Sequence, residues 1–311
     1  MEDWDLIILG AGSAGLASGI YGARSGLKTL ILEEKMAGGT ASDAPIVENY
    51  PGFLGISGME LVQNMIEQCR RSGATIHEFE TVTEANLGGE KKTVKTSKMS
   101  YDSSALILAM GSSYRQMGVT GEKEFRGRGV SYCGICDGPL FRGKRVAVVG
   151  GGNSALITAL YLSDIVAEVK LVHRRDTFRA EDTLVKSAQS KSNIAIMWNS
   201  EVKEIRGDKL VNKILIQDKK TNENSELQVD GVFVQVGEHP NSQIAKQAGV
   251  TVDTDGSVVV DFRQRTNIKG VFAAGDVTNH PVKQIGTAVG QGITAALEAY
   301  GYIRQPYHYK T

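Results

Sequence analysis

The sequence of 311 residues contains little of what marks several common classes of protein. It has only three cysteines, Cys69, Cys133 and Cys136, whereas a secreted protein stabilised by disulfides would usually carry more. Its 35 basic and 35 acidic side chains give a formal net charge of zero, which provides no general attraction for nucleic acid or anionic lipid. The stretch 1–5 is acidic, where a signal peptide would be basic. We therefore expect a cytoplasmic protein that binds neither nucleic acids nor membranes.

Charged residues are also absent between Leu6 and Ala23, a run long enough to suggest a membrane-spanning helix. This run contains five glycines and two serines, and its pattern changes midway from an apolar strand to a helix of small residues. We therefore reject a membrane span. The remaining composition, 41% hydrophobic and 23% charged, is that of globular domains, and the length suits two of them.

The first forty residues predict a βαβ unit. Residues 5–9 form a short apolar run typical of a buried parallel strand. A glycine-rich turn, 10–15, and a helical pattern up to Arg24 follow, and the next strand, 28–32, ends at Glu33.

The same pattern returns in the second half of the chain, where Gly150 corresponds to Gly10. Its parts are a strand, a glycine-rich turn, a helix and a second strand, at residues 145–149, 150–155, 156–163 and 169–172. This internal duplication predicts an α/β fold with two Rossmann-like units, each able to bind a dinucleotide.

The remaining segments predict how the two domains are connected. We place the crossings between them near 114–118 and near 239–244. The last stretch, 270–302, contains a strand and a long helix that return to the first domain. The expected domains are thus 1–116 with 244–311, and an inserted domain over 117–243. The strand-rich segments near 75–110 and 196–236 then make each domain a three-layer β/β/α structure.

A capping box predicts a further helix in the first domain. Ser57 precedes Glu60 by three residues, an apolar helical face that includes Cys69 follows, and Gly73 is a plausible stop. We expect Cys69 to be a packing residue.

The first glycine-rich turn has the order of residues that binding of a pyrophosphate requires. Gly10 permits the tight turn, Gly12 lets the backbone approach the phosphates, and Gly15 lets helix and strand pack closely. The start of the helix offers free N–H groups and the positive end of its dipole. Glu33, at the end of the second strand, can accept a hydrogen bond from a ribose hydroxyl.

The second unit differs at the position that corresponds to this acid. It has His173, Arg174 and Arg175, with Arg179 four residues further on. A carboxylate would repel a ribose 2′-phosphate, whereas guanidinium groups bind it, so this site favours NADP(H) over NAD(H). The alternative is a solvated basic turn.

The pair Cys133 and Cys136 encloses two residues and is followed by Asp137. Such a pair closes a small disulfide ring that is readily reduced and formed again. A structural zinc site would need four ligands, and the sequence offers no second cysteine pair or nearby histidine. Asp137 is a candidate proton donor or acceptor, with a simple turn residue as the alternative.

Near the C-terminus an apolar strand ends in Gly275-Asp276. A carboxylate at the carboxyl edge of a sheet can bind a hydroxyl group of a ligand. Gln284-Ile285 then precedes the final helix, whose dipole can stabilise negative charge on a bound group.

Taken together, these motifs resemble those of the low-molecular-weight thioredoxin reductases, and of archaeal members in particular. The resemblance extends over essentially the whole chain. The matching segments are 10–15, 38–40, 47–52, 133–138, 150–155, 173–180, 272–277 and 284–285.

The resemblance implies a homodimer with FAD in the domain built from both chain ends and NADPH in the inserted domain. Electrons would pass from NADPH through FAD to the Cys133–Cys136 disulfide and on to thioredoxin or a thioredoxin-like protein. By the family pattern Cys136 lies nearer the flavin, Cys133 attacks the disulfide of thioredoxin, and Asp137 is the acid. The family also rotates its NADPH domain, so that nicotinamide and dithiol take turns at the flavin.

The motifs and the resemblance together give two sets of expected cofactor-binding residues. For FAD these are Gly10, Gly12, Ser13, Ala14, Gly15, Glu33, Gly38, Gly39, Thr40, Asn49, Val82, Met110, Gly111, Gly275, Asp276, Gln284 and Ile285. For NADPH they are Gly150, Gly152, Asn153, Ser154, Ala155, His173, Arg174, Arg175, Arg179 and Gly237. No metal site is expected.

Several positions depart from the family pattern. Asn153, Ile157 and Thr158 stand where the family often has acidic residues, Lys283 replaces an arginine, and Met110 replaces a threonine. Because the first three lie on the nicotinamide side, they leave a different electron donor, NADH or reduced ferredoxin, as an alternative. Another disulfide partner and a non-enzymatic flavin or redox sensor are further alternatives. Tyr307, His308 and Tyr309 in the tail are expected either to stack on a flavin or to form a loose terminus.

Overall fold

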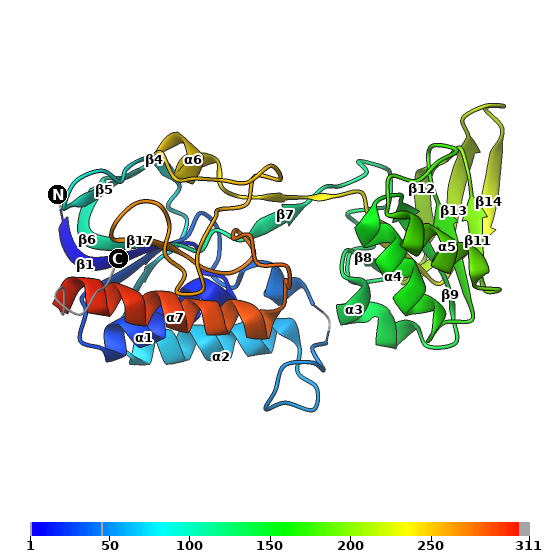
Figure 1. Ribbon diagram of the computed structural model, residues 1–311. Coiled ribbons are helices and arrows are strands. Elements are labelled where there is room, and N and C mark those ends of the chain that lie inside the picture. The colour runs from blue at the N-terminus through cyan, green and yellow to red at the C-terminus, as the bar shows by residue number, and fades with distance from the viewer. Residues whose placement is uncertain (1, 45, 305–311) are drawn as a thin grey trace. The chain divides into compact units, whose positions relative to one another are not determined.

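The computed structural model describes residues 2–44 and 46–304 (Figure 1). The contacts within the chain divide it into two compact units. The first joins Met1–Ser113 and His239–Thr311, and the second is Tyr114–Glu238.

The passages between the two units lie a few residues before the expected boundaries at 116/117 and 243/244. At these passages the short strands β7 (Ser112–Tyr114) and β16 (Glu238–Pro240) pair with each other. The aromatic tail Tyr307 to Tyr309 lies outside the described residues.

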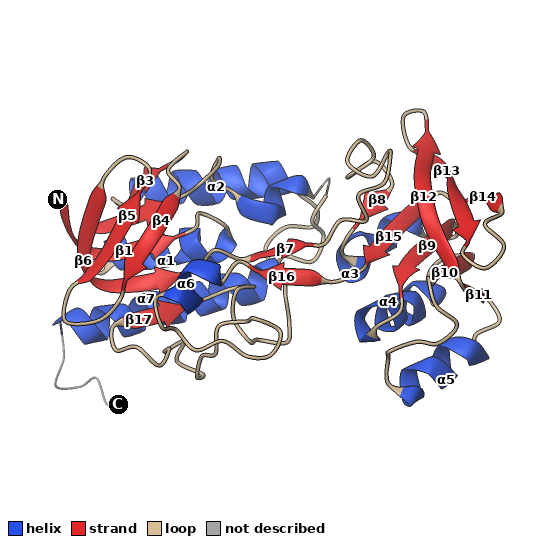
Figure 2. Cartoon of the chain, turned by 90° about the horizontal axis from the view of Figure 1, so that it is seen from above, coloured by secondary structure: helices blue, strands red, loops and turns tan. Residues whose placement is uncertain are grey.

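The first unit is built on a seven-stranded sheet with the order β3-β2-β1-β6-β5-β4, in which β17 also pairs with β6 (Figure 2). The strands that pair in parallel are β1 (Glu2–Leu9), β2 (Thr29–Leu32), β3 (Thr75–His77), β6 (Ser100–Leu108) and β17 (Val271–Ala273). The antiparallel extension consists of β4 (Val82–Asn86) and β5 (Lys92–Thr96).

Both faces of this sheet are buried, as the apolar run of β1 predicts. Leu6 and Ile8 face a core made with the helices α1 (Ser13–Arg24), α2 (Gly58–Arg71) and α7 (Ile285–Arg304). Ile7 and Leu9 face a second core on the opposite side, which includes residues from α6 (Gln243–Gln247), from β17 and from the loops before and after β17. The parallel strands therefore end at an edge that is held between two packed layers.

Ser57 caps the N-terminus of α2, as its place before Glu60 predicts. The hydroxyl oxygen of Ser57 accepts a hydrogen bond from the backbone N–H of Glu60 at 3.1 Å, and Gly73 follows the helix with a φ of 95°. Cys69 is fully buried, which confirms the expected packing role, and burial raises the pKa of its thiol to about 11.

The second unit has the expected three layers. Its parallel sheet has the order β11-β10-β9-β15-β8, and an antiparallel sheet of β12, β13 and β14 forms a separate layer. The parallel strands are β8 (Val130–Ser131), β9 (Arg145–Gly150), β10 (Glu168–Val172), β11 (Ile194–Met197) and β15 (Gly231–Gln235). The antiparallel strands are β12 (Ser200–Gly207), β13 (Val211–Asp218) and β14 (Asn224–Gln228).

Alternation along β9 separates the two cores of this unit. Val146 and Val148 face the helices α4 (Asn153–Ser163) and α5 (Asp182–Ser190). Ala147 and Val149 face the antiparallel sheet. Period-two alternation of fully apolar residues is what a strand between two apolar layers requires.

In each unit the strand order reverses between two neighbouring parallel strands, β1 and β6 in the first and β9 and β15 in the second. Ligands of such sheets bind outside the carboxyl ends of these strands. Both glycine-rich turns start at these ends.

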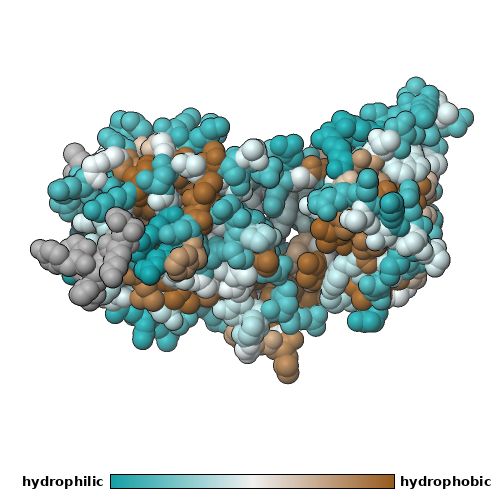
Figure 3. Space-filling view, viewed as in Figure 1, coloured by the Kyte–Doolittle hydropathy of each residue, from teal (hydrophilic) through white to brown (hydrophobic). Residues whose placement is uncertain are grey.

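Across residues 2–44 and 46–304 every helix is too short or too polar to span a membrane. The face drawn in Figure 3 is largely hydrophilic, with groups of apolar residues between. Some large apolar side chains are exposed, among them Leu54, Phe262 and Phe79.

Helix α7 contains two glycines that provide a matched test of helix packing. A Cβ at Gly292 would lie 2.3 Å from the carbonyl oxygen of Ala14 in α1, whereas a Cβ at Gly290 would meet no atom within 4 Å. We predict that Gly292→Ala lowers the free energy of unfolding by about 1–3 kcal/mol because α1 and α7 must separate. Gly290→Ala should raise it by up to about 1 kcal/mol through helix propensity. Chemical denaturation measures both, and equal effects of the two substitutions would contradict this account of the packing.

Candidate active site

The first glycine-rich turn is closed by contacts that only glycine allows. Gly10 has a φ of 100°, and a Cβ there would lie 2.4 Å from the carbonyl oxygen of Ala109. A Cβ at Gly15 would lie 1.9 Å from the carbonyl oxygen of Gly10. Strand, turn and helix therefore pack as tightly as a backbone can, in the roles expected for these two glycines.

Gly12 differs from these two, because the space beside it is open. The nearest atom to a Cβ at Gly12 is the Cα of Gly39, 3.9 Å away. The backbone N–H of Gly38 donates to the carbonyl oxygen of Ala11 at 2.9 Å, so the second expected FAD segment lies beside the first. The 3-10 turn that follows, Gly39–Asp43, contains Thr40.

The N-terminus of α1 is available to an anion. Among the described residues no side chain caps it, and its first turn, which contains Ser13 and Ala14, has no acidic residue. The contrast is α2, whose first turn is capped by Ser57 and contains Glu60. Uncapped N–H groups at a helix start next to an open glycine form a site that suits a pyrophosphate.

The structure places Glu33 directly beside this turn. One carboxylate oxygen accepts a hydrogen bond from the N–H of Ala11 at 2.7 Å, and the other accepts from the N–H of Lys35 at 2.9 Å. These bonds fix the orientation of the carboxylate. Each oxygen keeps a lone pair that can accept a hydrogen bond from a ribose hydroxyl.

Residues from the far end of the chain meet the same helix. A Cβ at Gly275 would lie 2.8 Å from the Cβ of Ala14, and the N–H of Gly275 donates to Gln291 at 2.6 Å. The side-chain amide of Asn49 donates to that of Gln284 at 3.1 Å. Ile285 is the first residue of α7, as expected. The structure therefore brings several members of the expected FAD set into one region of the first unit.

Other members of the FAD set lie at the ends of strands in the same unit. Met110 and Gly111 follow β6, and their carbonyl oxygens accept hydrogen bonds from Asn241 at 2.8 and 3.0 Å. Val82 is the first residue of β4. Asp276 is half-buried after β17.

The cysteine pair forms a disulfide in the second unit. Cys133 caps the short helix α3 (Gly134–Asp137), and its sulfur accepts a hydrogen bond from the N–H of Cys136 at 3.2 Å. A Cβ at Gly134 would lie 2.5 Å from Cγ2 of Thr158 in α4. The redox turn is thus packed against the helix that starts at the second glycine-rich turn. A disulfide supports the redox interpretation over the zinc alternative.

Asp137 is half-buried directly after this pair. Burial raises the pKa of its carboxyl group, and a hydrogen bond with Ser131 opposes the rise only in part. The group therefore keeps its proton to a higher pH than an exposed aspartate does, which suits a proton donor to a cysteine sulfur.

The second glycine-rich turn repeats the geometry of the first. Gly150 has a φ of 155°, and a Cβ there would lie 2.3 Å from the carbonyl oxygen of Gln235. A Cβ at Gly152 would meet no atom within 4 Å. In the described chain no side chain caps the start of α4, whose first turn is Asn153, Ser154 and Ala155. This turn is a second site that suits phosphate groups.

The ring of His173 packs against the second glycine-rich turn. A Cβ at Gly151 would lie 2.1 Å from its ring, one ring nitrogen lies 2.9 Å from the carbonyl oxygen of Thr177, and the ring contacts Phe178 and Trp198. Burial lowers the pKa of His173, so the neutral imidazole is favoured. Its expected role in the NADPH set is thus through the shape of the turn.

The three arginines of the expected NADPH set are exposed and lie close in sequence to His173. Arg174, Arg175 and Arg179 all face solvent. The backbone N–H of Arg179 donates to the carbonyl oxygen of Gly151 at 2.8 Å, which ties the basic segment to the glycine-rich turn. The last residue of the expected NADPH set, Gly237, lies further on, with a φ of 114° and a hydrogen bond from the N–H of Arg115.

Sequence analysis missed one pair at this turn. The side-chain amide of Asn153 donates to the carboxylate of Glu181 at 3.0 Å, and its oxygen accepts from the backbone N–H of Glu181 at 2.9 Å. The sequence places Asn153 in the expected NADPH set and marks it as a departure from the family pattern, but it does not predict this pair. The sequence shows a side-chain amide at the start of α4 that can both donate and accept hydrogen bonds, but it does not identify a partner 28 residues away.

The raised pKa of Asp137 gives a test with a defined sign. Below about pH 3 the carboxyl is protonated in both the folded and the unfolded protein, and it adds no folding penalty. Because the pKa is higher in the folded protein, the carboxyl ionises in the unfolded protein first as the pH rises. Ionisation then lowers the free energy of the unfolded state more than that of the folded state, so the folded state loses stability. We predict that Asp137→Asn raises the free energy of unfolding at pH 7 and has little effect near pH 3, measured by urea denaturation. A benefit of the same size at both pH values would contradict the assignment.

Comparisons with known proteins agree with this arrangement. The family model of the pyridine nucleotide-disulphide oxidoreductases matches residues 4–292. The chain is 40% identical over 303 residues to the thioredoxin reductase of Bacillus subtilis (strain 168), covering 97% of this chain and 95% of that protein.

Two solved structures are informative. The thioredoxin reductase of Streptococcus pyogenes MGAS5005 superimposes with a TM-score of 0.93 at 38% identity, covering 97% of this chain and 98% of that one. A ferredoxin-flavin thioredoxin reductase of Clostridium acetobutylicum has a TM-score of 0.53 at 35% identity, covering 97% and 99%. On these matches, the chain belongs to the pyridine nucleotide-disulphide oxidoreductases and, within them, to the low-molecular-weight thioredoxin reductases.

Proposed function

We propose that this protein is an NADPH-dependent, FAD-containing thioredoxin reductase. The observation that carries the proposal is the Cys133–Cys136 disulfide, packed through Gly134 against the helix that begins at the second glycine-rich turn. A disulfide with a purely structural role would not need to lie in the same unit as a helix start that suits the phosphates of a nucleotide.

The first unit fits FAD. The open space at Gly12, the uncapped start of α1 and the fixed carboxylate of Glu33 supply, in order, a backbone surface, N–H donors and a ribose acceptor. The region where Asn49 meets Gln284, just before α7, would hold the other end of the molecule. When bound, the flavin accepts a hydride equivalent from reduced nicotinamide and passes two electrons to a disulfide.

The second unit fits NADPH. Gly152 leaves open space at the uncapped start of α4, so the turn can hold a pyrophosphate. Arg174, Arg175 and Arg179 are exposed and can surround a ribose 2′-phosphate with fork-shaped donors. The domain that carries this site is proposed to be 117–243, and the FAD domain 1–116 with 244–311.

The cysteines perform thiol–disulfide exchange with the partner. Two electrons and two protons convert their disulfide to two thiols. The Cys133 thiolate then attacks the partner disulfide, so that one S–S bond breaks and a mixed disulfide forms. Attack by the Cys136 thiolate on the sulfur of Cys133 closes the ring again and releases the partner as a dithiol. The half-buried carboxyl of Asp137 can take a proton from each attacking cysteine thiol as its thiolate forms and give it to the departing sulfur of the partner.

The partner in this proposal is thioredoxin or a thioredoxin-like protein, and the enzyme acts as a homodimer in the cytoplasm. The low cysteine content supports a reducing compartment, where a single close pair is kept for redox chemistry. The net charge of zero supports a protein partner rather than a nucleic acid or a membrane.

A second candidate uses the same fold with reduced ferredoxin as donor. Glu181, held by Asn153 at the second glycine-rich turn, places a carboxylate close to where a phosphate would bind. The similarity to a ferredoxin-flavin thioredoxin reductase points the same way. The exposed arginines favour NADPH as the electron donor. A titration with each nucleotide distinguishes the two candidate donors.

This titration is made anaerobically on the purified protein and followed by its visible spectrum. We predict that stoichiometric NADPH bleaches the oxidised-flavin band and that NADH does so far less effectively. In a Cys133→Ser variant NADPH should still bleach the flavin band, because electrons reach the flavin before the cysteines. The variant should not reduce thioredoxin. A bound flavin that neither nucleotide bleaches would transfer the assignment to a ferredoxin donor. A protein that neither contains nor takes up flavin would refute the proposal.

The arginine cluster can be tested by its selectivity. Replacing Arg174 and Arg175 together by glutamine should lower kcat/KM for NADPH by about 10- to 100-fold, as expected for lost hydrogen bonds to a charged group, and leave that for NADH unchanged. The control is Arg142→Gln, an exposed arginine of the same unit outside the site, which should change neither value. An equal loss of kcat/KM with both nucleotides would show that the arginines do not bind the 2′-phosphate that distinguishes NADPH from NADH.

A further inference from the structure

Two glutamates are almost fully buried within the described residues, Glu80 and Glu122, with 2% and 1% of their surface exposed. Glu122 lies in the second unit, where it binds the backbone N–H groups of Met117 and Gly118 and the hydroxyl of Tyr132. Glu80 lies in the first unit and has no part in the chemistry described so far. A buried carboxylate is costly to desolvate, so its position needs an explanation.

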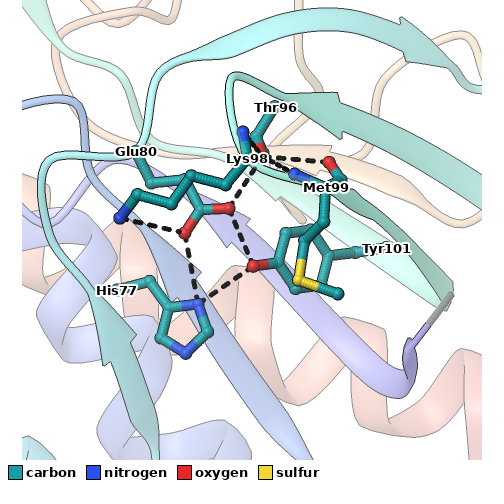
Figure 4. Close-up of polar contacts among 6 residues, drawn as sticks. All are labelled: His77, Glu80, Thr96, Lys98, Met99 and Tyr101. Carbon is teal, nitrogen blue, oxygen red and sulfur yellow. Dashed lines mark hydrogen bonds and ion pairs between the residues drawn. The ribbon is translucent and has the colours of Figure 1, made fainter.

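The carboxylate of Glu80 joins side chains from three strands or their ends (Figure 4). One oxygen accepts hydrogen bonds from the hydroxyls of Thr96, at the end of β5, and Tyr101, in β6, both at 2.7 Å. The other oxygen lies 3.4 Å from a ring nitrogen of His77, at the end of β3, and 3.8 Å from the ammonium group of Lys98. These four side chains account for both of its oxygens.

These partners keep Glu80 charged. Burial opposes ionisation, but the hydrogen bonds from Thr96 and Tyr101 and the charges of His77 and Lys98 outweigh it, so the pKa of Glu80 lies below its usual value. The carboxylate is therefore a fixed anion that can hold its own backbone in place.

The backbone that it holds is tied to the segment after β2. The N–H of Glu80 donates to the carbonyl oxygen of Glu33 at 2.9 Å, and the N–H of Phe79 donates to that of Lys35 at 3.2 Å. The side chain of Glu78 accepts from the N–H of Ala37 at 2.8 Å. Three successive residues, 78–80, thus bind the segment 33–37.

That segment connects two parts of the FAD site. It begins at Glu33, the acceptor for the ribose, and leads to Gly38 and Gly39, which lie against the first glycine-rich turn. On the other side of the loop, Val82 follows after one residue. A displacement of 78–80 would therefore shift both Glu33 and Val82, two members of the expected FAD set.

The loop is also held in an unfavourable conformation. Phe79 has a φ of 56°, in the left-handed region, although its side chain is large and 64% exposed. Such a residue persists only where its surroundings enforce it. The bonds of Glu80, the next residue, supply that enforcement.

We propose that Glu80 is a positioning residue for the adenosine half of FAD. It acts through the loop 78–80, which holds the backbone of the segment 33–37 between Glu33 and Gly38. The inference rests on the proposed FAD site. It predicts different effects on the two halves of the cofactor. Replacing Glu80 weakens binding of the adenosine half and leaves binding of the flavin mononucleotide half unchanged.

The test compares FAD with FMN, which lacks the adenosine. Full-length protein is freed of flavin, and the dissociation constants of both are measured from the quenching of flavin fluorescence, with FMN titrated into the millimolar range. We expect Glu80→Ala to weaken FAD binding by about 10-fold or more, the scale of a lost charged hydrogen bond, and to leave FMN binding unchanged. Tyr101→Phe, which keeps the buried ring and removes one bond to Glu80, should weaken FAD binding less, in the same direction.

Glu122→Gln is the matched control, because it alters an equally buried carboxylate in the other unit. It should lower the melting temperature and leave FAD affinity unchanged. If Glu80→Ala does not fold, Tyr101→Phe decides the question alone. Unchanged FAD affinity in Tyr101→Phe and Glu80→Ala, or an equal loss of FAD and FMN, would overturn the role of Glu80. Failure of the unaltered protein to bind FAD would instead overturn the proposed function, and this inference with it.

Discussion

The close packing of a strand end, a glycine-rich turn and a helix start is the constraint on which both units depend. At Gly15 and Gly150 a single additional carbon would overlap with a neighbouring carbonyl oxygen, so the helix can start this close to the sheet only with glycine. The same geometry directs the uncapped N–H groups of α1 and α4 towards open space at Gly12 and Gly152. Packing and anion binding are thus two results of one arrangement, which the chain builds twice.

The sequence predicts this arrangement well, because each of its signals is local. The apolar runs, the glycines and the cap at Ser57 lie within a few residues of the structure that they determine. Helices α1 and α4 begin at Ser13 and Asn153, inside the glycine-rich segments 10–15 and 150–155, so α4 starts three residues before the expected 156. The disulfide between Cys133 and Cys136 is local in the same sense. The three layers follow from the alternation of buried strands with helices.

The parts that could not be predicted depend on contacts between distant residues or on the direction of a side chain. Glu181 meets Asn153 across 28 residues, and Glu80 meets Tyr101 across 21. His173 stands in a motif that indicates cofactor binding, yet its ring lies buried under Gly151. A periodic pattern assigns a residue to a strand or a helix, but it does not say which polar neighbour a tertiary fold will bring to it.

The packing of Gly134 against Thr158 has a consequence for how this protein can change during evolution. The disulfide ring encloses only two residues, and they are not equally free to vary. Ile135 is 53% exposed, so a different side chain at this position can extend into solvent. Gly134 has no such freedom, because every other residue requires space that helix α4 occupies. Variation within the ring is therefore easier at one of its two inner positions, because the helix that begins at the second glycine-rich turn holds the other as glycine.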